Sequence, residues 1–188
     1  MAAAGRLFVV SAPSGAGKTT LIKKILNRLE NLSYSVSHTT RDPRGNEQNG
    51  RDYFFISVDE FEKKIAREHW LEWARVHDNF YGTSKDLVKN SLEKGKSLIL
   101  DIDVQGAQQM MTLGLDLVSI FIMPPSFEIL SRRLEKRGTD LKEVIARRLD
   151  NAKAEIAQKH LFQYVVVNDD LDQATERLCS IFKQEMAG

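Results

Sequence analysis

Continuous apolar runs recur along the chain and predict strands that are buried on both faces, as in a parallel sheet. Apolar residues at helical spacing follow the first run, between residues 21 and 29, and the last run, between residues 171 and 182. The pattern therefore predicts an α/β fold in which helices flank a parallel sheet. The runs are residues 7–10, 97–103, 117–123 and 164–167.

The alternation of strand and helix stops between residues 34 and 83, where strand-like segments predominate. In one of these segments Glu72 lies on the face opposite Trp73, because strand residues alternate between two faces. We infer a small inserted lobe. Its expected elements are a strand at residues 52–56, a helix capped by Ser57, a strand at residues 71–76 and a turn at residues 79–83.

Capping signals predict further helices after the inserted segment. A capping box beginning at Thr83 opens a helix that Gly95 closes, and a short helix follows from Val104. Ser126 caps another helix, and Asp140 starts a charged one. The last two helices carry arginines at positions 132, 133, 137, 147 and 148.

A glycine-punctuated loop between the first apolar run and the first helix indicates a phosphate cradle. Gly15 and Gly17 allow backbone angles at which successive amides turn toward an anion. Lys18 adds a charge for the outer phosphates, and Thr19 a hydroxyl suited to Mg²⁺. The strict pattern G-x-x-x-x-G-K-[ST] has glycine where this chain has Ala12. A chance turn is the alternative, which the order of strand, loop and helix disfavours.

Composition and charge exclude little. The 188 residues are 42% hydrophobic and 28% charged, as in one ordinary globular domain. With 27 basic and 26 acidic residues, the net charge of +1 requires neither a nucleic acid polymer nor a membrane as partner. We expect no membrane span and no secretion signal. The single cysteine, Cys179, predicts a packed thiol in a reducing, cytoplasmic setting.

Two arginines in the polar stretch after residue 34 indicate a second anion site. Arg41 and Arg44 are three residues apart, and Tyr53 follows them with a neutral hydroxyl donor. Guanidinium groups match phosphate oxygens in a forked geometry. From charge alone, a solvated turn is an equal alternative.

Several further segments resemble the guanylate kinase family in order and spacing, and the resemblance covers essentially the whole chain. The sequence Ser-Ala-Pro-Ser-Gly in the phosphate loop is found in many bacterial-type members, so the resemblance makes Ala12 an accepted variant. The matching segments are SHTTRDPR at 37–44, GRDY at 50–53, LEWA at 71–74, YGT at 81–83, ILDIDVQG at 99–106 and VNDD at 167–170.

The resemblance implies transfer of the γ-phosphoryl group of ATP to GMP, with Mg²⁺ accompanying ATP. The nucleophile would be an ionised GMP phosphate oxygen, so catalysis would need positioning and charge neutralisation and no general base. It further implies a P-loop kinase core at residues 1–33, 84–125 and 158–188, a small mixed β/α GMP-binding lobe at 34–83, and an arginine-rich helical lid at about 126–157.

The resemblance also assigns individual residues. Those at the ATP site are Ala12, Pro13, Ser14, Gly15, Ala16, Gly17, Lys18, Thr19, Thr20 and Asn168. Those that hold the GMP phosphate are Ser37, Arg41, Arg44, Tyr53 and Tyr81. Those on the guanine side are Glu72, Thr83 and Asp103.

The chemistry of Glu72 supports its assignment independently. Guanine presents two adjacent N–H donors on its Watson–Crick edge, and one carboxylate accepts both. Adenine lacks this pair, so AMP would leave a buried carboxylate unpaired and would be rejected. The alternative is an exposed strand carboxylate.

Asp101 follows an apolar strand, at the sheet edge where ligands of parallel sheets bind. It suits a magnesium site together with Thr19. An aspartate that caps the next helix is the alternative.

Lys18, Arg137 and Arg148 are the expected catalytic residues, because the resemblance places two lid arginines over the triphosphate, where they offset developing charge. A solvated helix face is the alternative for the neighbouring arginines 132, 133 and 147.

Two other functions remain possible from sequence. A guanylate-kinase-like module that binds proteins and has no activity typically lacks the loop lysine, whereas this chain keeps Lys18. A P-loop kinase for another small acceptor is disfavoured by one set of residues, Arg41, Arg44, Tyr53, Glu72 and Tyr81. ATP and GMP are thus the expected partners. The sequence leaves open the use of dGMP and the formation of a homo-oligomer.

Overall fold

The computed structural model describes residues 5–76, 78–136 and 142–187. Within these residues the core is a five-stranded parallel sheet of order β2-β7-β1-β8-β9. The predicted α/β fold is confirmed, with one strand more than the apolar runs suggested, because the short edge strand β2 is partly polar. The strands are β1 (Leu7–Ser11), β2 (Leu32–Tyr34), β7 (Ser97–Asp101), β8 (Leu117–Met123) and β9 (Tyr164–Val167).

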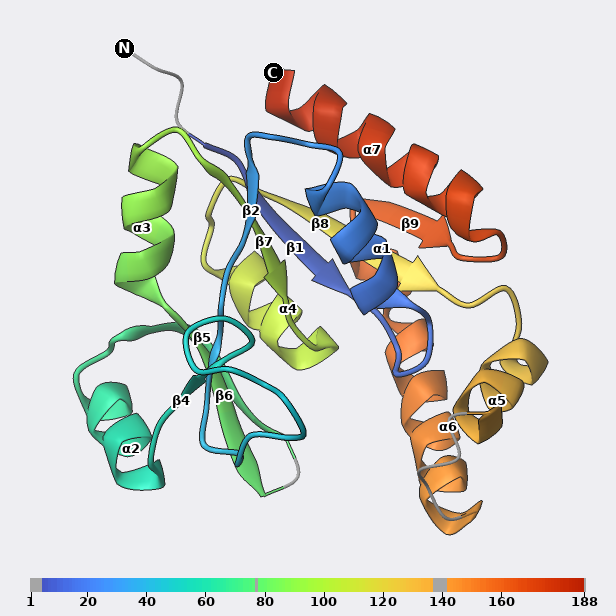
Figure 1. Ribbon diagram of the computed structural model, residues 1–188, viewed down its shortest axis with the longest axis horizontal. Coiled ribbons are helices and arrows are strands. Elements are labelled where there is room, and N and C mark those ends of the chain that lie inside the picture. The colour runs from blue at the N-terminus through green and yellow to red at the C-terminus, as the bar shows by residue number, and fades with distance from the viewer. Residues whose placement is uncertain (1–4, 77, 137–141, 188) are drawn as a thin grey trace.

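Helices cover both faces of this sheet (Figure 1). Alternate residues of β1 pack into the hydrophobic layers on the two faces of the sheet. Phe8 lies in one layer, where its ring centre is 4.4 Å from that of Phe182. Val9 lies in the other layer, together with Met110. Burial on both faces explains why β1 is continuously apolar. The helices are α1 (Lys18–Leu26) and α7 (Leu171–Ala187) on the first face, and α3 (Lys85–Glu93) and α4 (Val104–Thr112) on the second.

The segment between β2 and α3 forms a separate lobe around a mixed sheet of order β4-β3-β6-β5. Helix α2 packs against this sheet, and its N-cap is Ser57, as predicted. The elements of the lobe are β3 (His38–Thr39), β4 (Phe54–Phe55), α2 (Val58–Ala66), β5 (Trp70–Val76) and β6 (Asn79–Ser84).

The predicted turn at residues 79–83 is wrong, because these residues form β6, which pairs with both β3 and β5. Gly82 suggested a turn, but it lies inside the strand. A Cβ atom added there would lie 2.9 Å from the ring of Phe61 and 3.1 Å from that of Trp70. The glycine thus marks a close approach of aromatic rings to the strand.

The N-cap of α3 is Ser84 and not Thr83, which the capping box had suggested. The Ser84 Oγ accepts a hydrogen bond from the Leu87 N–H. The Thr83 hydroxyl is engaged elsewhere, because it donates to the Glu72 carboxylate at 2.5 Å.

Two helices, α5 (Phe127–Lys136) and α6 (Lys142–Ala157), pair through Leu130, Leu134 and Ala152. Ser126 caps α5, as predicted, by accepting the Ile129 N–H at 3.3 Å. Figure 1 shows this pair and the lobe flanking the same end of the core sheet. Residue 140 lies outside the described residues, so the predicted start of α6 stays a prediction. No described helix is long and apolar enough to cross a membrane.

The lobe has a small aromatic core, and we predict that it opens separately from the central sheet when this core is damaged. Phe61 is fully buried and stacks on Trp70 at 4.3 Å and on Phe80 at 5.2 Å. Phe61→Ala should destabilise the lobe by about 3–5 kcal/mol. Hydrogen exchange should accelerate in β5 and β6 while β1 and β8 stay protected. Phe127→Ala, at a partly exposed phenylalanine, is the control. Equal loss of protection in both sheets would contradict the prediction.

Candidate active site

The loop between β1 and α1 has the backbone of an anion cradle. Gly15 and Gly17 have φ angles of 91° and 93°, which disfavour other residues. A Cβ atom at Gly17 would also collide with the Asn168 amide. Helix α1 has no side-chain N-cap and no acidic residue in its first turn, so its positive end faces the loop unopposed. Ala12 does not have a positive φ, so the backbone there does not require glycine.

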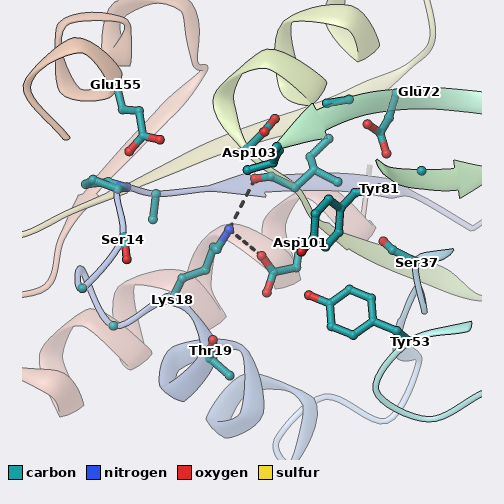
Figure 2. A pocket seen from close by; sticks show the side chains of 18 of the residues that line it. Ser14, Lys18, Thr19, Ser37, Tyr53, Glu72, Tyr81, Asp101, Asp103 and Glu155 are labelled. Atoms are coloured by element: carbon teal, nitrogen blue, oxygen red, sulfur yellow. Dashed lines mark hydrogen bonds and ion pairs between the residues drawn. The ribbon is translucent and has the colours of Figure 1, made fainter. Parts of the chain in front are cut away.

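Lys18 lies at the first position of α1 and pairs with a carboxylate at the end of β7. Its Nζ is 2.5 Å from Asp101 Oδ1 and 3.3 Å from the Ile102 carbonyl oxygen (Figure 2). Both side chains are largely but not fully buried. The register pairs Val10 of β1 with Asp101, so adjacent parallel strands bring these two charges to one edge. The ammonium is therefore held at the mouth of the loop.

A cavity of about 450 Å³ lies between the loop, the end of β7 and the lobe. It brings together most of the residues that the sequence singled out, although they come from segments far apart in the chain. Those that line it are Ala12, Pro13, Ser14, Gly15, Gly17, Lys18, Thr19, Thr20, Ser37, Tyr53, Glu72, Tyr81, Asp101 and Asp103.

Glu72 projects from β5 toward this cavity (Figure 2). It is only 5% exposed, whereas Trp73 is 36% exposed, which confirms that the two side chains lie on opposite faces. Burial raises the pKa of Glu72 to about 7, the hydrogen bond from Thr83 opposes this shift, and the Asp103 charge adds to it. Thr83 does not line the cavity itself but holds one carboxylate oxygen of Glu72.

The predicted second anion site is partly assembled. Ser37, Tyr53 and Tyr81 line the cavity, and burial raises the pKa of Tyr53, so its hydroxyl stays a proton donor. The Arg41 guanidinium lies 5.4 Å from the centre of the Tyr53 ring, behind the cavity lining. Arg44 is exposed and does not line the cavity.

Glu47 organises both arginines and was missed in the sequence. Arg41 Nη2 donates to both of its carboxylate oxygens, at 2.9 and 3.0 Å, and the Arg44 N–H donates to one at 2.8 Å. The available signal was an acidic residue three positions after the second arginine. Charge-assisted bonds of this kind fix the direction of the guanidinium plane.

Asn168 supports the phosphate loop from behind. Its side-chain Nδ2 donates to the Ala16 main-chain carbonyl at 2.7 Å. Its main-chain carbonyl accepts a hydrogen bond from Arg133 Nη2 at 3.0 Å. Asn168 and Arg133 both line a cavity of about 380 Å³ beside the loop. Arg133 Nη1 is buried without a hydrogen-bond partner among the described residues. Arg133 thus borders the site, whereas Arg132 is exposed.

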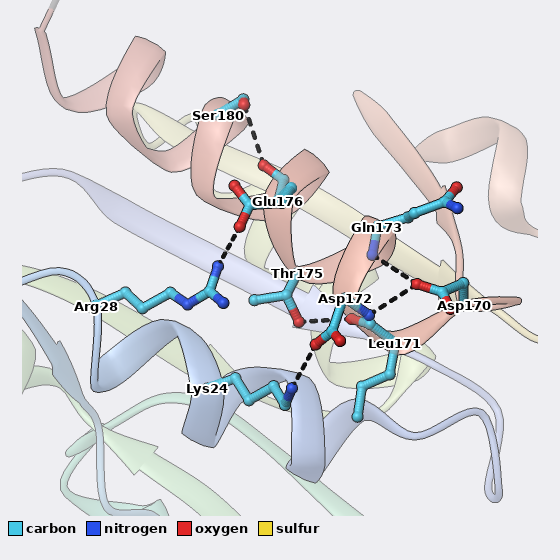
Figure 3. Close-up of polar contacts among 9 residues, drawn as sticks. All are labelled: Lys24, Arg28, Asp170, Leu171, Asp172, Gln173, Thr175, Glu176 and Ser180. Carbon is cyan, nitrogen blue, oxygen red and sulfur yellow. Dashed lines mark hydrogen bonds and ion pairs between the residues drawn. The ribbon is translucent and has the colours of Figure 1, made fainter.

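Helix α7 fixes both α1 and the segment that carries Asn168 (Figure 3). Asp170 caps α7 by accepting the N–H groups of the residues two and three positions later, at 3.0 and 2.9 Å. Lys24 and Arg28 of α1 form ion pairs of 2.6 and 2.5 Å with α7. Each exposed pair adds little stability, so these pairs mainly define how the two helices lie.

Helix α6 borders the loop on the side of Ser14. Arg147 and Arg148 line a cavity of about 540 Å³ that shares Ser14, Asp103 and Glu155 with the first one. Arg137 lies outside the described residues, so its predicted role stays a prediction.

Glu155 of α6 was also missed in the sequence. It faces the loop near Ser14 (Figure 2). Burial raises the pKa of Glu155 to about 7, the Lys18 charge opposes this shift, and the Asp103 charge adds to it. Its spacing of two helical turns from Arg148 was the available signal.

The residues present suit a magnesium ion bound together with phosphate. No group of three or more His, Cys, Asp or Glu side chains in the described ranges could hold a metal by itself. Mg²⁺ usually takes one or two carboxylates, with phosphate oxygens and water completing its shell. Thr19 and Asp101 both line the cavity. Asp101 does not cap α4, because Asp103 does so by accepting the Gly106 N–H at 2.7 Å.

A family model described as guanylate kinase matches residues 4–185. The chain belongs to the guanylate kinase family. A guanylate kinase of Dechloromonas aromatica is 51% identical over 180 residues, which cover 96% of this chain and 89% of that protein. One of Thermotoga maritima is 46% identical over 97% of this chain and 88% of that protein. The crystal structure of guanylate kinase from Anaplasma phagocytophilum has a TM-score of 0.80, at 35% identity, over 99% of this chain and 88% of that chain.

For this guanylate kinase family member we predict that Glu72→Gln changes stability in a pH-dependent way. The folded pKa of Glu72 is about 7 and its ordinary value 4.5, so the folded state holds the proton more tightly. The stabilisation is complete below pH 4.5 and is lost as the pH rises through 7. Glutamine does not titrate, so the variant should gain about 2–4 kcal/mol relative to wild type over that range.

Urea unfolding at half-unit steps of pH measures this difference, and Glu62→Gln, at an exposed carboxylate of α2, is the control. Parallel stability curves for Glu72→Gln and wild type would show that the burial of Glu72 has no such consequence.

Proposed function

We propose that this protein is a guanylate kinase that transfers the γ-phosphoryl group of ATP to GMP, giving ADP and GDP. One observation carries the proposal: a phosphate loop with its lysine and a buried carboxylate suited to guanine line the same cavity. A loop that served ATP hydrolysis would not need that carboxylate. Membership of the guanylate kinase family supports the same conclusion.

Glu72 is the residue that we propose reads the base. Thr83 holds one of its oxygens, and Asp103 lies close enough to raise its pKa. The two N–H donors of guanine favour the ionised carboxylate, so binding would oppose the effect of burial. AMP offers no such pair and would leave the carboxylate buried and unpaired.

The phosphate of GMP would bind beside the lobe sheet. Ser37, Tyr53 and Tyr81 already line the cavity there, and Arg41 lies directly behind Tyr53. We propose that Arg41 and Arg44 supply the charge for this phosphate. Glu47 orients the guanidinium of Arg41, so this group is already in position before the ligand binds.

ATP would bind with its phosphates on the loop and on the N-terminus of α1. Thr19 and Asp101 would hold Mg²⁺, which neutralises phosphate charge when bound. Lys18, now paired with Asp101, would point its ammonium to the outer phosphates. The cavity lined by Arg133 and Asn168 lies beside the loop and would take the base of ATP, over which a guanidinium can stack.

Transfer then requires alignment. An ionised oxygen of the GMP phosphate attacks the γ-phosphorus while the bond to the β-phosphate oxygen breaks, and ADP leaves. Lys18, Arg148 and Arg137 would offset the charge on the transferring group. We also propose the division into a core at residues 1–33, 84–125 and 158–188, a GMP-binding lobe at 34–83 and a lid at about 126–157. Closure of lobe and lid would exclude water.

The proposal is tested by ADP release with ATP, Mg²⁺ and a panel of nucleoside monophosphates. We expect turnover with GMP and a kcat/KM for AMP that is lower by at least about 10³-fold. A site built to accept two hydrogen bonds from its substrate rejects an analogue that lacks the donors by such a factor. Equal turnover with AMP, or none with GMP, would overturn it. A module that only binds proteins would show no turnover at all.

Lys18→Ala should lower kcat by at least about 10²-fold, because it removes a charge aimed at the transferring phosphoryl group. Circular dichroism should show a folded protein, since Lys18 faces the cavity and not a core. Lys23→Ala removes the same charge from an exposed position of the same helix and should leave kcat unchanged. Near-normal activity of Lys18→Ala would refute its role.

A further inference from the structure

Helix α4 of the core contacts strand β5 of the lobe directly behind Glu72. The helix begins after Asp103, and two of its residues, Gly106 and Gln109, are one turn apart on the side that meets β5. Neither residue was singled out in the sequence as part of a site. Gly106 lies against the carboxylate of Glu72, and Gln109 bonds to the main chain of Trp73.

Gly106 leaves the space that the carboxylate occupies. A Cβ atom at this position would lie 2.7 Å from Glu72 Oε2 and 3.4 Å from its Cδ. Gly106 is buried in the first turn of α4, where its N–H donates to the capping carboxylate of Asp103. Its backbone does not have a positive φ, so conformation does not require glycine there. What the glycine provides is room for one oxygen of Glu72.

Gln109 holds the strand itself. Its Oε1 accepts the Trp73 N–H at 3.3 Å, and its Nε2 donates to the Trp73 carbonyl at 3.0 Å. Strand β5 lies at the edge of the described lobe sheet, so these main-chain groups point away from β6. The amide of Gln109 therefore occupies the place of a neighbouring strand. Since Trp73 follows Glu72, this pair of bonds fixes the backbone from which the carboxylate projects.

We propose that α4 is the positioning element for guanine selection, with Gly106 setting the place of Glu72 Oε2 and Gln109 setting the register of β5. The proposal rests on the proposed function, because it assumes that Glu72 reads guanine. Thr83 bonds to Oε1 from the lobe, and Gly106 of α4 leaves the space for Oε2 on the side of the core. The places of the two oxygens thus depend on different parts of the chain, and both oxygens must be in place to meet two N–H donors at once.

The geometry also separates specificity from stability. The atom that a side chain at position 106 would meet most closely is the end of the Glu72 side chain, which lines the cavity and can move into it, while Asp103 Oδ1 lies 3.4 Å away. The same movement would displace the reading group, and an error of about 1 Å in such a group can cost 10²-fold in rate. Gly106→Ala should therefore keep the fold and lose selectivity, which a purely structural role would not produce.

Steady-state kinetics of Gly106→Ala test the proposal. We expect the KM for GMP to rise at least about tenfold and the ratio of kcat/KM for GMP to that for AMP to fall by a similar factor. The KM for ATP should stay within about twofold, and the melting temperature should change little, because the displaced group is the end of a side chain that lines the cavity. An unchanged KM for GMP would overturn the proposal.

A double-mutant cycle with Glu72→Asp links the effect to the carboxylate. The shorter side chain avoids the added methyl group, so Glu72→Asp should cost less in kcat/KM for GMP in the Gly106→Ala background than in wild type, by at least about fivefold. Equal costs in the two backgrounds would show that the alanine acts elsewhere and would overturn the proposal.

Gln109→Ala tests the second contact and serves if Gly106→Ala does not fold. It should raise the KM for GMP about three- to tenfold, in line with loss of two solvent-accessible hydrogen bonds, and should speed amide exchange at Trp73. Gln108→Ala is the matched control, since Gln108 bonds to Gln158 and not to β5. Equal effects of the two variants would overturn the role of Gln109. Absence of GMP turnover in wild type would instead refute the proposed function.

Discussion

The ion pair between Lys18 and Asp101 joins the phosphate loop to the neighbouring strand at the carboxyl edge of the sheet. Two opposite charges that are mostly shielded from water must be neutralised by each other or by a ligand. The parallel register of β1 and β7 makes this arrangement possible, because it ends both strands at the same level. The glycines of the loop, the amide of Asn168 and the contacts between α1 and α7 all keep that edge in place.

The lobe has the opposite design, with a small apolar core beside many buried polar groups. Phe61 and Trp70 form most of its aromatic centre, whereas Ser37, Arg41 and Glu72 are buried and polar. Arg41 and Glu72 have hydrogen-bond partners within the lobe, Glu47 and Thr83, as buried polar groups generally do. A ligand that bound only the folded lobe would stabilise it further.

The sequence allowed the sheet, the loop and the opposite orientation of Glu72 and Trp73 to be predicted, since these follow from local periodicity. It did not allow β6 to be recognised, because Gly82 suggested a turn, where in fact it makes room for two rings. Asp103 and not Asp101 turned out to cap α4, a distinction of geometry between two aspartates close in sequence. Gln109 remained hidden because its partner on β5 is set by a tertiary contact, which no local pattern encodes. Glu47 and Glu155 were missed although their spacing from nearby arginines was a local signal.

The bond between Asn168 and Ala16 spans 152 positions of the chain. The strand that leads into the phosphate loop lies between β7 and β8, so both of its sheet neighbours are also made much later. During synthesis the loop emerges first but lacks its flanking strands and its supporting amide until translation is almost complete. A nascent chain consequently gains the ability to hold a nucleotide only at the end of its synthesis, and a chain shortened before β9 would lose it while keeping every residue of the loop.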